Sequence, residues 1–165
     1  MTHSRRIATL TPCAGRCSTV FGDAVCRGCR RFNHEVIQWN GYDAAQRYAV
    51  WKRLDAQLDQ ILVPMLPLAQ LPLVEVFLEN KRIRCLETAS VGRKFYLALK
   101  YCEKRREATV DSGLGLDRKQ VKALWDEFER RVIALANASY DFAWLRADAM
   151  RQHLTPSQQT CDDIV

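Results

Sequence analysis

Four of the seven cysteines in this 165-residue chain lie close together near its N-terminus. They follow the pattern Cys-x3-Cys-x8-Cys-x2-Cys, and a short loop between the two pairs could place four thiolate sulfurs at the corners of a tetrahedron, as zinc requires. The segment has few apolar side chains, so a bound metal would have to offset the entropy cost of ordering it. The pattern therefore predicts one metal centre, with the ligands Cys13, Cys17, Cys26 and Cys29.

The kind of metal stays open at this level. Four thiolates leave a net charge of about −2 on zinc and on an oxidised iron–sulfur core alike. The compact spacing, without apolar residues to shield a cluster from water, favours zinc, and an iron–sulfur cluster is the alternative. Gly28, inside "CRGC", suits a backbone turn that brings amide groups close to sulfur in either case.

The positive charge of the chain is concentrated in two segments. Residues 1–34 carry six arginines against Asp23 alone, and residues 80–106 carry nine basic residues against two glutamates, in a chain of net charge +6. Such side chains bind phosphates through counterion release and, for arginine, paired hydrogen bonds. We therefore predict a basic surface for RNA, DNA or an acidic protein, formed by Arg16, Arg27, Arg30, Arg31, Lys104, Arg105 and Arg106.

Composition indicates a soluble globular chain, with 48% hydrophobic and 27% charged residues. It contains no apolar run of membrane-spanning length and no signal peptide at its start, so a cytoplasmic protein with reduced thiols is expected. Reduced and clustered cysteines indicate metal rather than disulfides. The remaining cysteines, Cys85, Cys102 and Cys161, are predicted to be small core residues or, in the tail, a free thiol.

Nothing in the sequence has the pattern of an active site. The three histidines lack catalytic partners nearby, and no phosphate-binding loop or nucleophile motif is present. Four cysteine ligands would leave zinc no open position for a substrate. Two functions remain: a binding or adaptor module with a structural metal site, or an iron–sulfur protein for electron transfer or redox sensing.

Helical periodicity and turn signals predict a mainly α fold. Asn33 and Asp43 are expected to cap two helices separated by Asn40-Gly41, and Ser90 and Asp117 to cap two later ones. The expected parts are a four-cysteine metal-binding module over 1–34, helices packed on it over 35–62, an extended Pro-rich strap over 63–75, a helical domain over 76–152 and a flexible tail over 153–165.

One segment has two possible secondary structures, and the two parts of the chain differ in the core that they can form. The segment "VEVFLENKRIRCLE" suits either a short hairpin or a helix. The module itself offers only Val20, Phe21, Val25 and Phe32 as apolar side chains. The helical part has a predicted core of its own, made by Trp51, Leu54, Phe95, Leu99, Trp125 and Phe128.

The stretches "TPCAGRC", "CRGCRR", "EVIQW" and "AAQRYAVWKRL" resemble a widespread family of small bacterial proteins, a domain of unknown function commonly described as predicted iron–sulfur proteins. The resemblance covers about residues 11–54. It implies that the same four cysteines bind the metal or cluster, accompanied by the motif residues Gly28, Arg31, Glu35, Trp39 and Arg47. Phe32 departs from the family pattern, which usually has a threonine that caps the following helix. We therefore expect that helix to start at Asn33 or to be held by the metal loop.

Overall fold

A computed structural model describes residues 11–86, 88–105 and 110–154 of the chain. Within these ranges the protein contains helices and no strand, and the only β-type pairing is an isolated bridge between Val25 and Phe32. The mainly α fold is confirmed. The α-helices are α2 (Asn33–Ile37), α3 (Ala44–Met65), α4 (Leu71–Asn80), α5 (Val91–Arg105) and α6 (Arg118–Leu154), with short 3-10 helices η1 (Ser18–Phe21), η2 (Trp39–Gly41) and η3 (Val110–Ser112).

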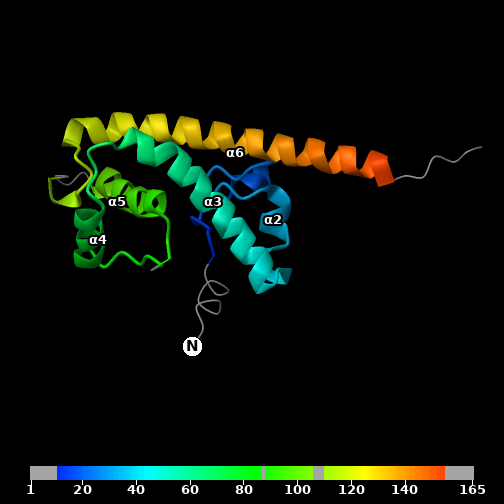
Figure 1. The fold of residues 1–165 in the computed structure, drawn as a ribbon, viewed down its shortest axis with the longest axis horizontal. Coiled ribbons are helices and arrows are strands. Elements are labelled where there is room, and N and C mark those ends of the chain that lie inside the picture. The colour runs from blue at the N-terminus through cyan, green and yellow to red at the C-terminus, as the bar shows by residue number, and fades with distance from the viewer. Residues whose placement is uncertain (1–10, 87, 106–109, 155–165) are drawn as a thin grey trace, which may run out of the picture.

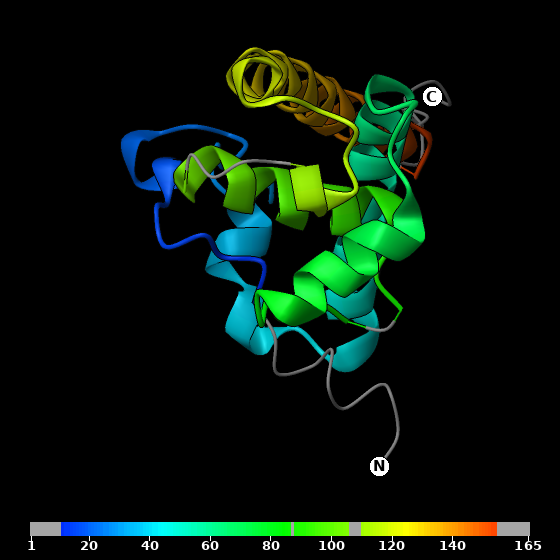
Figure 2. The same ribbon diagram turned by 90° about the vertical axis from the view of Figure 1, so that its left-hand side faces the viewer.

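Helix α6 runs along the longest dimension of the molecule. Its N-terminal half packs on α3 and α5, while its C-terminal half extends past the helical body (Figure 1). All side chains from 141 to 153 are exposed, including Phe142, Trp144 and Leu145. Figure 2 shows α3, α4 and α5 gathered on one side of α6. The first two residues of the predicted tail, 153 and 154, continue α6 as helix.

Three of the four predicted caps are confirmed. Asp43 accepts a hydrogen bond from the Gln46 N–H, and Gln46 accepts one from the Asp43 N–H, so the two form a capping box at the start of α3. Asp117 and Gln120 make the same pair of bonds before α6. Ser90 accepts from the third residue of α5.

The cap of α2 differs from the prediction. The helix starts at Asn33, but its N-cap is Phe32 and not Asn33. A phenylalanine side chain cannot accept a hydrogen bond, so only half of a capping box remains. The Glu35 carboxylate accepts from the Phe32 N–H at 2.8 Å.

The extended strap predicted over 63–75 is largely helix, which corrects that assignment. Pro72 lies in the first turn of α4, where the N–H that proline lacks would have no partner within the helix. Pro64 removes one helix bond, but it lies one residue before the end of α3, so the loss falls in the last turn. Only residues 66–70 connect the two helices. The hairpin alternative is also wrong, because Val74, Phe77 and Leu78 form the buried face of α4.

The main hydrophobic core lies between α3, α4, α5 and α6. Leu62, Leu99 and Phe128 are fully buried in it, and Phe95 belongs to the same cluster. Of the other predicted core residues, Trp125 packs at its margin, whereas Trp51 and Leu54 join Trp39 in a separate cluster: Trp39, Val50, Leu54, with Tyr42 and Trp51.

The cysteine module packs its own few apolar residues against α6. Val25 and Phe32 are buried with Ala136, whereas Val20 and Phe21 are 73% and 88% exposed. The module therefore shares a core with the long helix rather than enclosing one.

Candidate metal centre

The turn from Cys26 to Cys29 is tightly folded. The Arg30 N–H donates to the Cys26 carbonyl at 2.7 Å, and the Cys26 N–H donates to the Arg31 carbonyl at 2.8 Å. Arg30 has a φ of 62°, a left-handed conformation that reverses the chain immediately after Cys29. The turn thereby places both cysteines in the protein interior.

The Cys26 sulfur is buried, and its thiol donates to the Arg16 carbonyl oxygen at 3.8 Å. Burial raises the pKa of this thiol, but hydrogen bonds from the N–H groups of Cys29, Ser18 and Gly28 outweigh burial and lower the pKa to about 7. Hydrogen bonds of this kind orient and stabilise thiolates bound to metal. Cys26 thus sits in an environment suited to a thiolate ligand.

The second sulfur of this turn is supported by an arginine. Burial raises the pKa of Cys29, and the Arg31 Nε–H, which donates to the sulfur at 3.4 Å, acts in the opposite direction. The Arg31 guanidinium lies 4.8 Å from the centre of the Trp39 ring. Two motif residues of the resemblance, Arg31 and Trp39, therefore act together behind Cys29.

The first cysteine pair lies on a more exposed turn. The Cys13 sulfur accepts from the Gly15 N–H at 3.4 Å, and the Cys17 sulfur is 3.0 Å from the Thr19 hydroxyl. This turn touches the other one at Gly28, where a β-carbon would lie 2.6 Å from the Arg16 carbonyl oxygen. The absence of a side chain at Gly28 is what allows the two cysteine turns to meet.

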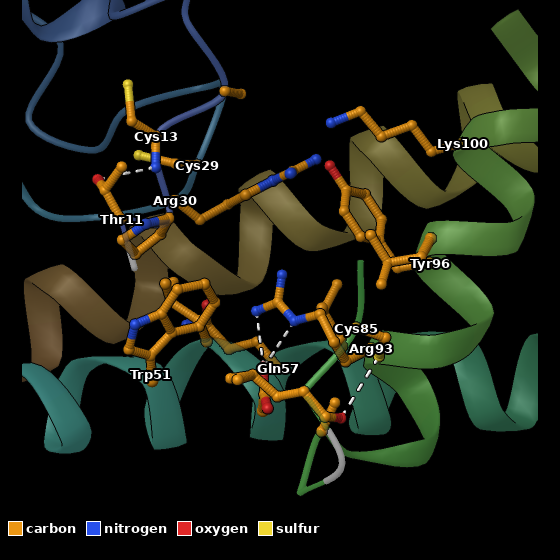
Figure 3. Close-up of a pocket in the computed structure, with 18 of the residues that line it drawn as sticks. Thr11, Cys13, Cys29, Arg30, Trp51, Gln57, Cys85, Arg93, Tyr96 and Lys100 are labelled. Carbon is orange, nitrogen blue, oxygen red and sulfur yellow. Dashed lines mark hydrogen bonds and ion pairs between the residues drawn. The ribbon is translucent and has the colours of Figure 1, made fainter. Parts of the chain in front are cut away.

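The four cysteines are not gathered into one cluster. Among the described residues, no three Cys, His, Asp or Glu side chains are arranged to hold a metal ion. Cys26 and Cys29 share a turn, and Cys13 and Cys29 line one cavity (Figure 3), whereas Cys17 lines a separate surface groove with Arg16. One turn therefore buries Cys26 and Cys29 together, whereas Cys13 and Cys17 lie on separate surfaces.

Two members of the predicted basic surface are buried, which corrects that part of the prediction. Arg30 and Arg31 are only 6% and 3% exposed. Arg30 forms a 2.5 Å ion pair with Glu129 on α6, and its guanidinium lies over the rings of Tyr96 and Phe128. The Arg30 charge therefore joins the module to α5 and α6, whereas the Arg31 charge faces Cys29 and Trp39.

The other basic residues are separate on the surface. Arg27 is exposed and pairs with Asp23 at 3.0 Å, and Arg16 is exposed beside it in the same groove. Lys104 and Arg105 are exposed at the end of α5, and no described contact joins them to the module. Arg106 lies outside the described residues.

The motif residues Glu35 and Arg47 hold the module against α3. Buried Glu35 binds the Arg53 guanidinium at 2.5 Å, and Arg53 also stacks on the Phe32 ring at 3.9 Å. Arg47 donates to the carbonyl oxygens of Trp39 and Asn40. Arg53 lies within the stretch of the resemblance, but its role does not follow from spacing, because its partners Glu35 and Phe32 lie outside its own helix.

A large cavity beside the module was also missed. It has a volume of about 700 Å³ and lies between the cysteine turns, α3, α5 and the segment before α5 (Figure 3). Its walls come from segments far apart in sequence, and no single motif predicts such a site. The labelled residues include Cys29, Arg30, Trp51, Gln57, Arg93 and Lys100.

Within the described ranges, the remaining cysteines and histidines suggest no second site. Cys102 is buried in the main core, as predicted, and half-buried Cys85 has a pKa raised by burial. His34 and His153 are exposed. His3 and Cys161 lie outside the described residues. No helix in the described part of the chain is both long and apolar enough to cross a lipid bilayer.

Comparison with known proteins identifies the N-terminal third. Residues 11–58 match a family described as "Protein of unknown function (DUF1289)". No curated protein and no solved structure matches the chain. The match covers the four cysteines, Glu35, Trp39, Arg47 and Arg53, and it includes the whole stretch of the resemblance.

Proposed function

We propose that the protein is a binding module whose residues 11–32 are held by one structural metal centre on Cys13, Cys17, Cys26 and Cys29. The main support is the turn from Cys26 to Cys29, which buries both cysteines within four residues of each other. The turn that carries Cys13 and Cys17 already touches this pair at Gly28. Because that turn is exposed, it can rotate its sulfurs towards the pair when metal binds.

The metal determines whether a redox role is open to the protein. Zinc has no redox chemistry, and a closed four-thiolate zinc site would act only as a staple. An iron–sulfur cluster would instead support electron transfer or redox sensing. Protein purified without oxygen should be colourless with about one zinc per chain, whereas broad absorbance near about 400 nm with bound iron and sulfide would favour the redox alternative.

Cysteine variants test the ligand set. Cys26→Ser and Cys29→Ser should each lose the metal, and Cys13→Ser and Cys17→Ser should weaken its binding. Cys85→Ser is the control, since Cys85 is half-buried outside the module. If Cys13→Ser and Cys17→Ser keep full metal content and affinity, the four-cysteine site is wrong.

The exposed end of the module supports a binding role. Phe21 is 88% exposed, and it lines a surface groove of about 540 Å³ together with Arg16 and Arg27. An exposed aromatic ring next to arginines is typical of proteins that stack on the bases and contact the phosphates of single-stranded nucleic acids. We propose that this tip, formed by Phe21, Arg16 and Arg27, binds single-stranded RNA or DNA without sequence preference.

Fluorescence anisotropy with labelled oligonucleotides tests this role. At about 50 mM salt, the protein should bind oligo-U and oligo-A similarly, because counterion release favours phosphate contacts at low salt. Phe21→Ala should weaken binding by about tenfold, the usual effect of losing one stacked base. Phe142→Ala, which removes a ring on α6 that is 67% exposed, is the matched control.

Two results would reject the nucleic-acid role. One is that the intact, metal-loaded protein binds neither RNA nor DNA at this salt concentration. The other is that Phe21→Ala and Phe142→Ala bind equally well. In either case the tip is better assigned to an acidic protein surface, which Arg16 and Arg27 would also fit.

A further inference from the structure

The cavity beside the cysteine module has the features of a ligand site. Its volume of about 700 Å³ is in the range of small-molecule pockets. We propose that it binds a small organic anion, with a carboxylate or phosphate group held by cationic side chains and a neutral body that hydrogen bonds to its inner wall. This inference goes beyond the structural metal centre, but because the cysteine turns form one wall of the cavity it rests on the module being folded.

The charge of the walls favours an anion. Among the described lining residues, the cations are Arg30, Arg84, Arg93 and Lys100, and Asp55 is the one carboxylate. Asp55 is already paired with Arg93 at 2.7 Å. Lys100 and Arg84 have no ion pair with any described residue, so their charges are available to a ligand.

Aromatic rings hold the cations in place around the cavity. The Arg93 guanidinium lies 5.1 Å from the centre of the Trp51 ring, and the Lys100 ammonium lies 5.3 Å from that of Tyr96 (Figure 3). Cation–π contacts of this kind restrict the side chains without using their hydrogen-bond donors. The cations are therefore preorganised for an incoming anion.

Three buried polar atoms of the lining residues lack a partner: Arg30 Nε, Trp51 Nε1 and Gln57 Oε1. Arg30 and Gln57 are only 6% and 5% exposed. Buried polar groups are nearly always hydrogen-bonded in proteins, so these three atoms are places where a ligand could supply a missing bond. A ligand that reached them would need acceptors for the two N–H groups and a donor for the oxygen.

The orientation of Gln57 is fixed by its neighbours. The Ser139 hydroxyl donates to the Leu135 carbonyl at 2.7 Å, so it can only accept from Gln57. The Gln57 amide nitrogen donates to that hydroxyl at 3.2 Å. The amide oxygen is consequently the atom left without a partner, and a ligand needs a hydrogen-bond donor to reach it.

The rest of the lining favours an organic body over an inorganic ion. Leu54, Leu58, Leu97 and Val132 contribute apolar surface between the polar groups. A bare phosphate would leave this surface in contact with water, whereas an organic body would cover it. Cys13 and Cys29 lie on the wall nearest the module, so the ligand would sit next to the cysteine turns.

A matched pair of fluorescent probes tests the charge requirement in the full-length protein. 1-Anilinonaphthalene-8-sulfonate and N-phenyl-1-naphthylamine share a ring system, and only the first carries an anionic group. The sulfonate should bind at one site per chain and about tenfold more tightly, as expected for charge-assisted hydrogen bonds. Equal affinity for the two probes would overturn the proposal.

Two variants on α5 locate the anion. Lys100→Gln should weaken the sulfonate probe by about tenfold and leave the neutral probe unchanged. Lys104→Gln, one helical turn further along and not part of the lining, should change neither. If both variants weaken the sulfonate probe equally, the effect is general surface charge and the cavity is not the site.

Displacement of the bound sulfonate probe identifies the charged group. Adenosine 5′-monophosphate against adenosine tests a phosphate, and indole-3-acetate against indole tests a carboxylate. Displacement by an anion and not by its neutral counterpart supports the proposal and assigns the group. If neither anion displaces the probe at millimolar concentration, the proposal is rejected. Metal content measured on the same sample separates this result from loss of the metal centre.

Discussion

The Arg53 guanidinium on α3 and the Glu35 carboxylate on α2 form a 2.5 Å ion pair that joins the cysteine module to the helical body. The Glu35 side chain is almost completely buried, and the same oxygen accepts the Phe32 N–H. One carboxylate therefore accepts the N–H at the start of α2 and also pairs with an arginine of α3.

Replacing Glu35 by glutamine should destabilise the protein by about 3 kcal/mol, near the lower end of the cost of breaking a buried ion pair, because Arg53 keeps some contact with solvent. Chemical denaturation measures the change. In a double-mutant cycle with Arg53→Met, the second substitution should cost much less in the Glu35→Gln background than in the wild type. Additive effects would contradict a direct pairing.

Gly28→Ala should separate the two cysteine turns. Its new methyl group would lie 2.6 Å from the Arg16 carbonyl oxygen, and such overpacking costs about 1–3 kcal/mol. We expect reduced metal content and weaker metal affinity in this variant, measured by elemental analysis and competition with a chelator. Gly41→Ala is the control, since nothing lies within 4 Å of the position of its added methyl group. Equal metal affinity in the two variants would show that the turns do not need to touch.

The two halves of α6 should respond differently to the same substitution. Phe128→Ala creates a cavity in the main core and should cost about 3–5 kcal/mol. Phe142→Ala, on the exposed half, should change stability by no more than about 0.5 kcal/mol. Thermal unfolding followed by circular dichroism compares the two, and a large loss for Phe142→Ala would mean that this half of the helix is covered in solution.

Removing the metal should unfold the module and leave the helical body folded. The main core contains no residue from 11–32, so it does not depend on the cysteine turns. Chelation should make amides around Cys26 exchange rapidly with solvent while those of α3, α5 and α6 stay protected. Far-ultraviolet circular dichroism should change little. Loss of most helical signal on chelation would instead show that the module nucleates the whole fold.

The sequence by itself determined the features that depend on near neighbours. The helix starts after Asp43, Ser90 and Asp117 follow from side chains that bond amides two or three residues away. The turn at Asn40-Gly41 and the mainly α class follow from equally local signals. The prolines were misleading for a local reason too. Pro72 lies in the first turn of α4, where its missing N–H has no partner to lose, and Pro64 removes a bond only in the last turn of α3.

Only the tertiary structure decided which charged side chains are free to contact a ligand or a partner. Arg30 and Arg31 look like surface residues next to a metal site, but Arg30 meets Glu129, which is 99 residues away, and Arg31 stacks on Trp39. The same is true of the cavity, whose walls come from the module, α3, α5 and α6. Burial of a charge depends on partners that folding brings from a distance, and residue spacing within a short segment carries no information about them.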